Sequence, residues 1–414
     1  MNATSFLYFQ ITSMSGPKYS KLVAFIFCIF SSSIYSQQVL HLEPATDRNY
    51  TVVDIDIPKS IARQIHDPLR SGSNIPVNKM LIDGREVKVK EVKTRGKSSA
   101  FFYRKSFNVQ LEDDFEFEGS QGIKKMKKFY LLAQAMDVHY FRNYFAFTMM
   151  HDLKVAKFYF QYAELRLNGK TEGIYLLIER PYDVALKDKD APVVIRRLES
   201  RHIDQEKVSK KVPATLTKES KRAFAAIPDF CKDLHGQSLY DSLNRYLDLK
   251  DYFSWLAFNY WAKNGDYTDE VCYYIQPDHP GIRFGIVPWD FDDLLTQQPH
   301  EGMDLRNRRL GDALIYSSED ILDRTIAEDS VLYAHYLDHF REILPKMSSP
   351  ARLQEIFTRI YQDLEPLYED PANYEISEHD REATDPHAMK DNLVKVYSFL
   401  INRSEEIKHQ LERN

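Results

Sequence analysis

Residues 264–295, NGDYTDEVCYYIQPDHPGIRFGIVPWDFDDLL, contain two short apolar runs with acidic residues on both outer flanks. The runs Val271–Ile275 and Ile282–Val287 are typical of strands, and Pro277–Gly281 between them is typical of a turn. In such a hairpin the strands run antiparallel, so the start of the first strand lies beside the end of the second. We therefore expect one end of the hairpin to gather the carboxylates of both flanks, which are Asp266, Asp269, Glu270, Asp290, Asp292 and Asp293.

Carboxylates packed together repel one another unless a cation or a shared proton compensates their charge. Mg²⁺ suits such a site because it binds through one or two carboxylates together with the phosphates of a substrate. The structural alternative is that these residues belong to turns and helix starts, where Asp is common. Two acidic clusters joined by one hairpin, and preceded by the aromatic helix expected over Tyr252–Asn264, favour a metal or acid–base site.

Strand patterns dominate the chain before this region. Apolar and polar residues alternate over residues 50–57 and 106–111, and two further runs turn at Asp83-Gly84 and Asn168-Gly169. Both dipeptides favour the tight turns of β-hairpins. Residues 137–153 carry apolar residues at helical spacing, so we expect one helix among these strands.

The character of the sequence changes twice after the second of these hairpins. Residues 183–220 are rich in Lys, Asp and Glu and predict a solvated linker or insertion. Helical periodicity dominates from residue 221 onward. We therefore expect an α+β fold with two lobes, divided into a β-rich domain over 45–182, the linker over 183–220, and a helical domain over 221–414 that contains the hairpin 264–295.

The basic side of a phosphate site is expected in the strand-rich part. Residues 94–111, TRGKSSAFFYRKSFNVQL, place Arg95 and Lys97 in a Gly/Ser loop and Lys105 at the start of a strand. Backbone N–H groups and cationic side chains in such a loop can hold phosphate oxygens. The stretch lacks both G-x-G-x-x-G and the P-loop G-K-[ST] sequence, so an exposed basic turn is the alternative. Lys124–Lys128 (KKMKK) is expected to be a solvated stretch.

The first residues have the order of a secretory signal. Lys18 and Lys21 precede the apolar run Leu22–Phe30, and serines follow it. We predict a signal peptide over residues 1–36, with Met14 as the more typical start, and an alternative in which the run is a buried strand. The run is too short for a membrane-spanning helix, which needs about 20 residues, so no transmembrane anchor is expected. The predicted location is secreted, periplasmic or on the cell surface.

Charge and cysteine content exclude two further classes. The 55 Lys and Arg residues are outnumbered by 61 Asp and Glu residues, giving a net charge of −6. A nucleic-acid partner is therefore not expected, because such proteins usually carry a strongly basic domain. Outside the predicted signal only Cys231 and Cys272 remain, without the spacing of a zinc site or a disulfide scaffold. We interpret them as inert buried thiols, with a disulfide between them as the alternative.

The order of these features is similar to that of protein kinases, in which a helix, a loop Asp, a hairpin and a second Asp follow one another. Asp266 and Asp290 take the two Asp positions. The chain also resembles the CotH-like spore-coat protein kinase family over about Val52 to Leu295. Five blocks in the same order carry the resemblance: Arg95–Ser99 with Arg104-Lys105, Leu131–Asn143 (LLAQAMDVHYFRN), Leu165–Glu179 (LRLNGKTEGIYLLIE), Asn264–Asp266, and Pro288–Asp292 (PWDFD).

The resemblance implies an atypical, bilobal protein-kinase-like fold that binds ATP with Mg²⁺ or Mn²⁺ and phosphorylates Ser or Thr of proteins at the cell envelope. By position, Asp266 corresponds to the catalytic Asp of the family and Asp290 to its metal-binding Asp. Lys105 corresponds to the phosphate-contacting Lys, oriented by Glu179. Asp292 is implied as a second metal ligand or a structural carboxylate.

Further residues follow from the same resemblance. Arg95 and Lys97 are implied to neutralise the phosphates. Glu270 is implied as a carboxylate ligand to a second metal, because many members have an Asn near this position. Lys97 also departs from the family, in which Asn is frequent at this position. The remaining matched polar residues are expected to brace the junction of the two lobes: Asp137, Arg142 and Asn143.

Two other functions fit the same sequence features. The chain could be a surface or coat assembly protein that retains the fold without catalysis, because ATP is scarce outside the cytoplasm. It could also be a carbohydrate-active enzyme with paired carboxylates. The latter requires two acids about 5–9.5 Å apart in an open cleft lined by aromatic side chains and free of basic residues.

Overall fold

The structure is a computed structural model that describes residues 40–45, 48–67, 72–96, 98–199, 202–209, 212–380 and 385–413. The predicted signal peptide 1–36 and Lys97 lie outside the described residues. The chain from His41 to Asn414 forms one compact unit. Within the described ranges, every helix is too short or too polar to cross a bilayer.

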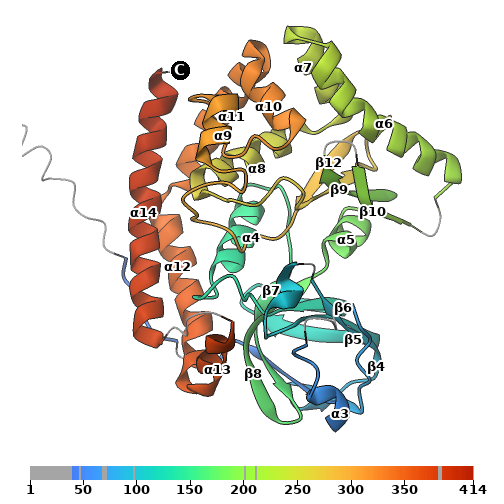
Figure 1. The fold of residues 1–414 in the computed structure, drawn as a ribbon, viewed down its shortest axis with the longest axis vertical. Coiled ribbons are helices and arrows are strands. Elements are labelled where there is room, and N and C mark those ends of the chain that lie inside the picture. Colours follow the sequence, from blue (N-terminus) through green and yellow to red (C-terminus); the bar gives the residue numbers. More distant parts are fainter. Residues whose placement is uncertain are drawn as a thin grey trace, which may run out of the picture. The chain divides into compact units, whose positions relative to one another are not determined.

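The strand-rich part forms one large sheet, which has eight strands in the described part of the chain (Figure 1). The strand order is β3-β2-β1-β7-β8-β6-β5-β4. All neighbours are antiparallel except β1 and β7, which pair in parallel. The strands are β1 (Thr51–Asp56), β2 (Lys79–Ile82), β3 (Arg85–Glu86), β4 (Val89–Arg95), β5 (Ser106–Gly119), β6 (Gly122–Leu132), β7 (Phe160–Leu167) and β8 (Lys170–Glu179).

Both predicted hairpins are formed, and their turn residues explain why. Asp83 and Gly84 have φ of 48° and 74°, and Asn168 and Gly169 have φ of 51° and 75°. Two successive positive φ angles are the requirement of a type I′ turn, which these residue types tolerate. In the first hairpin the second strand, β3, has only two residues, and both are exposed. The chain then continues to β4, which pairs with β5 at the opposite edge of the sheet.

A second sheet has the strand order β10-β9-β11-β12. Its strands are β9 (Val193–Glu199), β10 (His202–Val208), β11 (Val271–Ile275) and β12 (Phe284–Pro288). The predicted solvated linker 183–220 is therefore wrong over β9, which pairs with β11. Val193, Val194 and Ile195 are all fully buried. Three apolar residues are enough for a central strand, and the surrounding charges concealed them in the composition.

The helical part begins inside the predicted linker. Its helices are α6 (Ala214–Asp233), α7 (Gly236–Tyr246), α8 (Leu249–Ala262), α9 (Met303–Leu310), α10 (Ile321–Glu328), α11 (Ser330–Met347), α12 (Pro350–Leu364), α13 (Ala372–Glu375) and α14 (Pro386–Arg413). Short turns fill the rest: α3 (Lys59–Ala62), η2 (Ser98–Phe101), α5 (Pro181–Asp183), η3 (Val184–Asp188), η4 (Glu365–Glu369) and η5 (Ile376–His379). The predicted α+β class is confirmed.

Helix α8 is the buried centre of the helical part. The Asp248 side chain caps its first turn by accepting from the Asp251 amide at 3.4 Å. Almost every residue of α8 is buried, including Trp255 and Trp261 at 0% exposure. The helix ends at Lys263, whose backbone is left-handed with φ of 49°, and this turn leads directly into the acidic segment.

Helix α4 (Arg142–Asp152) joins the two parts of the fold and packs against α12 (Figure 1). Its Phe147 is fully buried. The ring of Phe147 lies 4.7 Å from Phe158 and 5.8 Å from Phe160, which belong to the strand-rich part. It also lies 5.7 Å from Trp289 and 5.3 Å from Phe291, which follow β12. The predicted helix 137–153 therefore starts later than expected and serves as a common aromatic core.

The cysteine interpretation is also confirmed. Cys231 and Cys272, both in the described part of the chain, form no disulfide, and both are buried. Burial raises the pKa of the Cys231 thiol to about 12. A protonated, enclosed thiol is unreactive.

Replacing Phe147 tests the junction. We expect Phe147→Ala to lower the free energy of unfolding by about 3–5 kcal/mol, because the ring is lost from a site enclosed by four aromatic side chains. Phe101→Ala is the matched control: Phe101 is 76% exposed, and its loss should change the free energy by less than about 0.5 kcal/mol. Chemical denaturation of both variants measures the difference, and equal effects would contradict a junction held by Phe147.

Candidate functional site

The β11–β12 hairpin brings the two acidic flanks side by side. Val271 pairs with Pro288 at the end of the ladder. Beyond it the Trp289 amide donates to the Glu270 carbonyl at 2.8 Å, and the Gly265 amide donates to the Asp293 carbonyl at 3.0 Å. Residues 264–270 and 289–293 therefore run alongside each other, and six acidic side chains project from one end of the hairpin.

The start of α4 holds the second acidic segment in place. The Asn143 amide oxygen accepts from the Phe291 backbone N–H at 2.9 Å, and Arg142 Nη1 donates to the Asp292 carbonyl at 2.7 Å. Asp137 in turn accepts from the Arg142 backbone N–H at 2.6 Å. These contacts put all three residues at the junction, where a bracing role was expected.

Asp290 has an unusual backbone for a residue with a side chain, with φ of 51°. Asp tolerates the left-handed region better than most residues, but the conformation is uncommon outside glycine. It persists here because the hydrogen bonds of the flanking residues Trp289 and Phe291 fix the chain on both sides.

Glu270, Asp290 and Asp292 hold their protons more tightly than ordinary carboxyl groups. Burial, and then the charges of Asp290, Asp269 and Asp266, raises the pKa of Glu270 to about 8, against the opposing charge of Arg196. Burial also raises the pKa of Asp290 and Asp292, and in Asp292 the neighbouring Asp290 adds to the effect. Concentrated negative charge in a partly enclosed site is the physical cause.

Asp266 occupies a more open position at the same end of the hairpin. Its side chain is 38% exposed, and its carboxylate lies 3.5 Å from His300 Nδ1. Burial raises the pKa of Asp266 to about 6; His300 opposes the rise, and Asp269, Asp290 and Asp293 add to it.

Two arginines supply the positive side of the site. The Arg95 guanidinium lies over the Tyr130 ring at 4.2 Å and 5.7 Å from the Trp289 ring. Arg196 Nη2 contacts Glu270 Oε2 at 2.7 Å. Both guanidiniums oppose the rise in the pKa of Asp290. The structure thus brings Arg95, predicted from the basic loop, to the acidic end of the hairpin.

Arg196 was missed by sequence reasoning because it lies inside the stretch interpreted as a linker. The available signal was the apolar run Val193–Ile195 directly before it, which indicates a strand. On β9, Arg196 pairs with Cys272 of β11, close to where the acidic flank of β11 begins. His300 was also missed, and nothing in the local sequence distinguishes it.

The donor set suits a hard divalent cation. Oxygen ligands are what Mg²⁺ prefers, and the crowded carboxylates would lose repulsion by sharing one. In the ranges that the structure describes, no three Asp, Glu, His or Cys side chains are arranged to hold a metal by themselves. Mg²⁺ in proteins is commonly bound through one or two carboxylates, with water and substrate phosphate completing its shell.

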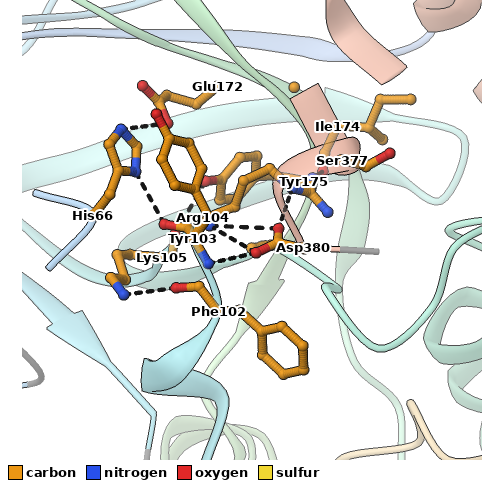
Figure 2. Close-up of polar contacts among 12 residues, drawn as sticks. His66, Phe102, Tyr103, Arg104, Lys105, Glu172, Ile174, Tyr175, Ser377 and Asp380 are labelled. Atoms are coloured by element: carbon orange, nitrogen blue, oxygen red, sulfur yellow. Dashed lines mark hydrogen bonds and ion pairs between the residues drawn. The ribbon is translucent and has the colours of Figure 1, made fainter. Parts of the chain in front are cut away.

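Lys105 and Glu179, both in the described part of the chain, do not pair as predicted. The Lys105 ammonium donates to the Phe102 carbonyl at 2.6 Å (Figure 2). It also donates to the Ala100 carbonyl at 2.7 Å. Burial lowers its pKa. Glu179 instead accepts from the Tyr159 backbone N–H at 2.8 Å and lies 2.8 Å from Lys124.

The sheet order explains this correction. Strand β6 lies between β5, which follows Lys105, and β8, which ends at Glu179. A carboxylate on β8 therefore meets β6 first, and Lys124 belongs to that strand. Lys124 also contacts Asp188 at 2.9 Å, so the KKMKK stretch is not entirely solvated, as had been expected.

Comparison with known proteins gives one family. A model of the family described as CotH kinase protein matches residues 92–406. The search of curated proteins found no match. The crystal structure of the Helicobacter pylori proinflammatory kinase CtkA is similar with a TM-score of 0.34 and 11% identity, covering 77% of this chain and 97% of that chain. We draw nothing about the site from a structural similarity at this level.

The family match extends beyond the resemblance seen in the sequence. The matched blocks ended near Leu295, whereas the family model continues through the helices to residue 406. It therefore includes the acidic hairpin and most of the C-terminal helices, among them α12, which packs against α4. Because the match covers more than half of the 414 residues, the chain belongs to the CotH kinase protein family, and a kinase-like function is supported.

Proposed function

We propose that this chain is a metal-dependent protein kinase that transfers the γ-phosphate of ATP to Ser or Thr of proteins at the cell envelope or surface. The observation that carries the proposal is that Asp266, Glu270, Asp290 and Asp292 lie at one end of the β11–β12 hairpin and interact electrostatically, with Arg95 close enough to Asp290 to oppose the rise in its pKa. Phosphoryl transfer needs positioned reactants and neutralised charge more than covalent chemistry. An acidic cluster facing a guanidinium supplies both. The predicted signal over residues 1–36 supports export.

Asp290 is the residue that would hold the metal. It lies at the centre of the cluster, and its backbone is fixed by α4 and by the hairpin. A divalent cation held by Asp290 would supply positive charge that neutralises the phosphates of the nucleotide. The charge of Asp290 adds to the rise in the pKa of both Asp292 and Glu270, so these two carboxyl groups lie near it and could complete the same site.

Asp266 would orient the hydroxyl that receives the phosphate. Of the carboxylates in this argument it is the one next to an exposed histidine, and its own side chain is open to solvent. A protein substrate could therefore reach it from outside. The carboxylate can accept a hydrogen bond from a Ser or Thr hydroxyl, which aligns the oxygen for in-line attack.

Arg95 and Arg196 would neutralise the phosphates. A guanidinium forms paired hydrogen bonds to phosphate oxygens, and the aromatic rings of Tyr130 and Trp289 hold Arg95 in a defined position. Lys97 and Lys105 remain predictions as additional phosphate contacts. For Lys105 this would require the ammonium to leave the two carbonyls that it now binds.

Removal of the Asp290 carboxylate tests the nucleotide site. We expect Asp290→Ala to abolish the binding of Mg²⁺–ATP, because the metal loses its main ligand. Asp278→Ala is a matched control, since Asp278 is an exposed acid at the opposite end of the same hairpin. Calorimetric titration measures both affinities. Equal affinities in the wild type and Asp290→Ala would exclude Asp290 as the metal ligand.

A second variant separates catalysis from binding. Asp266→Asn keeps the shape of the side chain but loses its basicity, so we expect phosphate transfer to fall by about 10²–10⁴-fold while Mg²⁺–ATP affinity changes little. Incubation with labelled ATP and Mg²⁺ or Mn²⁺ measures self-labelling, with Asp304→Asn on the exposed face of α9 as the control. A wild type that neither labels itself nor is thermally stabilised by ATP and metal would indicate a non-catalytic assembly protein.

A further inference from the structure

The C-terminal segment Ala372–Asp380, formed by α13 and η5, docks on strand β8 of the large sheet. Thr171 Oγ1 donates to Asn373 Oδ1 at 2.6 Å. At Gly173, with φ of 91°, a Cβ atom would lie only 2.8 Å from the Asn373 carbonyl oxygen. This position requires glycine, so the segment is fitted closely against the strand.

Asp380, the last residue of this segment, binds Tyr103 and Arg104 near the end of the loop that connects β4 to β5 (Figure 2). Its carboxylate accepts from the backbone N–H of Tyr103, from the backbone N–H of Arg104 at 3.2 Å, and from Arg104 Nε at 2.9 Å. The side chains of Arg104 and Asp380 are each only 1% exposed. One buried carboxylate therefore fixes two consecutive residues through three donors. Such charge-assisted hydrogen bonds are the strong ones in proteins.

Further contacts hold Tyr103 and Arg104 in place. The Tyr103 ring is stacked between His66, at 3.8 Å, and His379, at 4.4 Å. His66 Nδ1 contacts the Tyr103 carbonyl at 2.9 Å. Arg104 Nη1 donates to the Ile174 carbonyl at 3.2 Å. Residues from three distant parts of the chain thus hold positions 103 and 104.

The contacts that hold Tyr103 and Arg104 lie next to the candidate site, because β4 and β5 pair where this loop joins them. Residues 96–105 connect β4 to β5, and Ser106, at the start of β5, pairs with Arg95, at the end of β4. Lys105 closes the connection by donating to Ala100 and Phe102 inside it. Whatever fixes Tyr103 and Arg104 therefore also limits where Arg95 can lie relative to Asp290.

We propose that Asp380 is a positioning residue for the phosphate side of the site, acting from the C-terminal segment through Tyr103 and Arg104 on the loop that begins at Arg95. This inference rests on the proposed function, because it assumes that Arg95 faces bound nucleotide. It gives the C-terminal segment a role in the site although the segment touches none of the acidic residues described above.

The first measurement follows the loop without any nucleotide. In the full chain carrying Asp380→Asn, we expect the amides of Tyr103 and Arg104 to exchange hydrogen at least about tenfold faster, with β7 and β8 unchanged. Glu378→Gln is the matched control, because Glu378 is an exposed acid in the same segment. Unchanged exchange at Tyr103 and Arg104 would overturn the proposal. So would an equal increase throughout the sheet, since this would indicate a general loss of structure.

A double variant separates the loss of the loop contacts from the destabilisation that an unpaired buried charge would cause. Asp380→Asn leaves the buried Arg104 charge without its partner, which is costly. Arg104→Gln combined with Asp380→Asn removes both members of the buried ion pair, and with them the carboxylate that fixes the loop. Faster exchange at residues 103 and 104 in both variants supports the proposal, and wild-type protection in the folded double variant overturns it.

The second measurement connects the loop to the site. We expect the dissociation constant for Mg²⁺–ATP to rise about tenfold in Asp380→Asn and to stay within about twofold in Glu378→Gln, measured by calorimetry. Unchanged affinity with a loosened loop would overturn the positioning role. A wild type that binds no Mg²⁺–ATP would refute the proposed function; the exchange measurement would then still decide whether Asp380 holds the loop.

Discussion

Antiparallel pairing of β11 with β12 concentrates six acidic side chains at one end of a five-residue ladder, and much of the surrounding structure compensates for that concentration. Burial, to which the neighbouring carboxylates add, raises the pKa of Glu270 to about 8 and that of Asp266 to about 6. Three separate elements place nitrogen-bearing side chains at this end of the hairpin: the guanidinium of Arg95 at the end of β4, that of Arg196 on β9, and the imidazole of His300 in the loop before α9. A site with this balance is suited to bind a polyanion together with a divalent cation.

Rigid support comes from aromatic packing and from buried hydrogen bonds. Phe147 of α4 touches rings from the large sheet and from the segment after β12, so both parts share one core. At the start of the same helix, Asn143 and Arg142 hold the backbone of the acidic segment. The location of the acidic cluster is therefore tied to the sheet that carries Arg95, which is what charge complementarity between the two parts requires.

Two buried ion pairs help to specify which distant segments of the chain pack together. Arg104 with Asp380 and Arg197 with Asp320 join residues far apart in the sequence, and all four side chains are nearly inaccessible. Desolvation cancels much of the energy of such pairs, so their value as stabilisers is small. Breaking one, however, leaves an isolated buried charge. They therefore specify which distant segments meet, and in the first case they determine where the C-terminal segment docks.

Local sequence patterns were sufficient to predict the hairpins, the acidic cluster and the family. Asp83-Gly84 and Asn168-Gly169 have the conformations that such turns require, and the two acidic flanks meet because neighbouring strands pair. The failures have two causes: a weak local signal and a partner that is remote in sequence. The strand β9 was hidden by charges around three apolar residues, and Lys105 was assigned to Glu179 although a whole strand separates them.

The sequence by itself determined the α+β class, the acidic end of one hairpin and membership of the CotH kinase family, because each depends on contacts between neighbouring residues or on ordered motifs. Only the tertiary structure decided that Arg196 faces Glu270, that Glu179 binds Lys124, and that Asp380 holds the basic loop. Each of these pairs joins residues at least 55 positions apart, so no periodicity or spacing encodes it. Their selection depends on how the two sheets and the C-terminal helices pack, which fixes the one partner that a buried charge can reach.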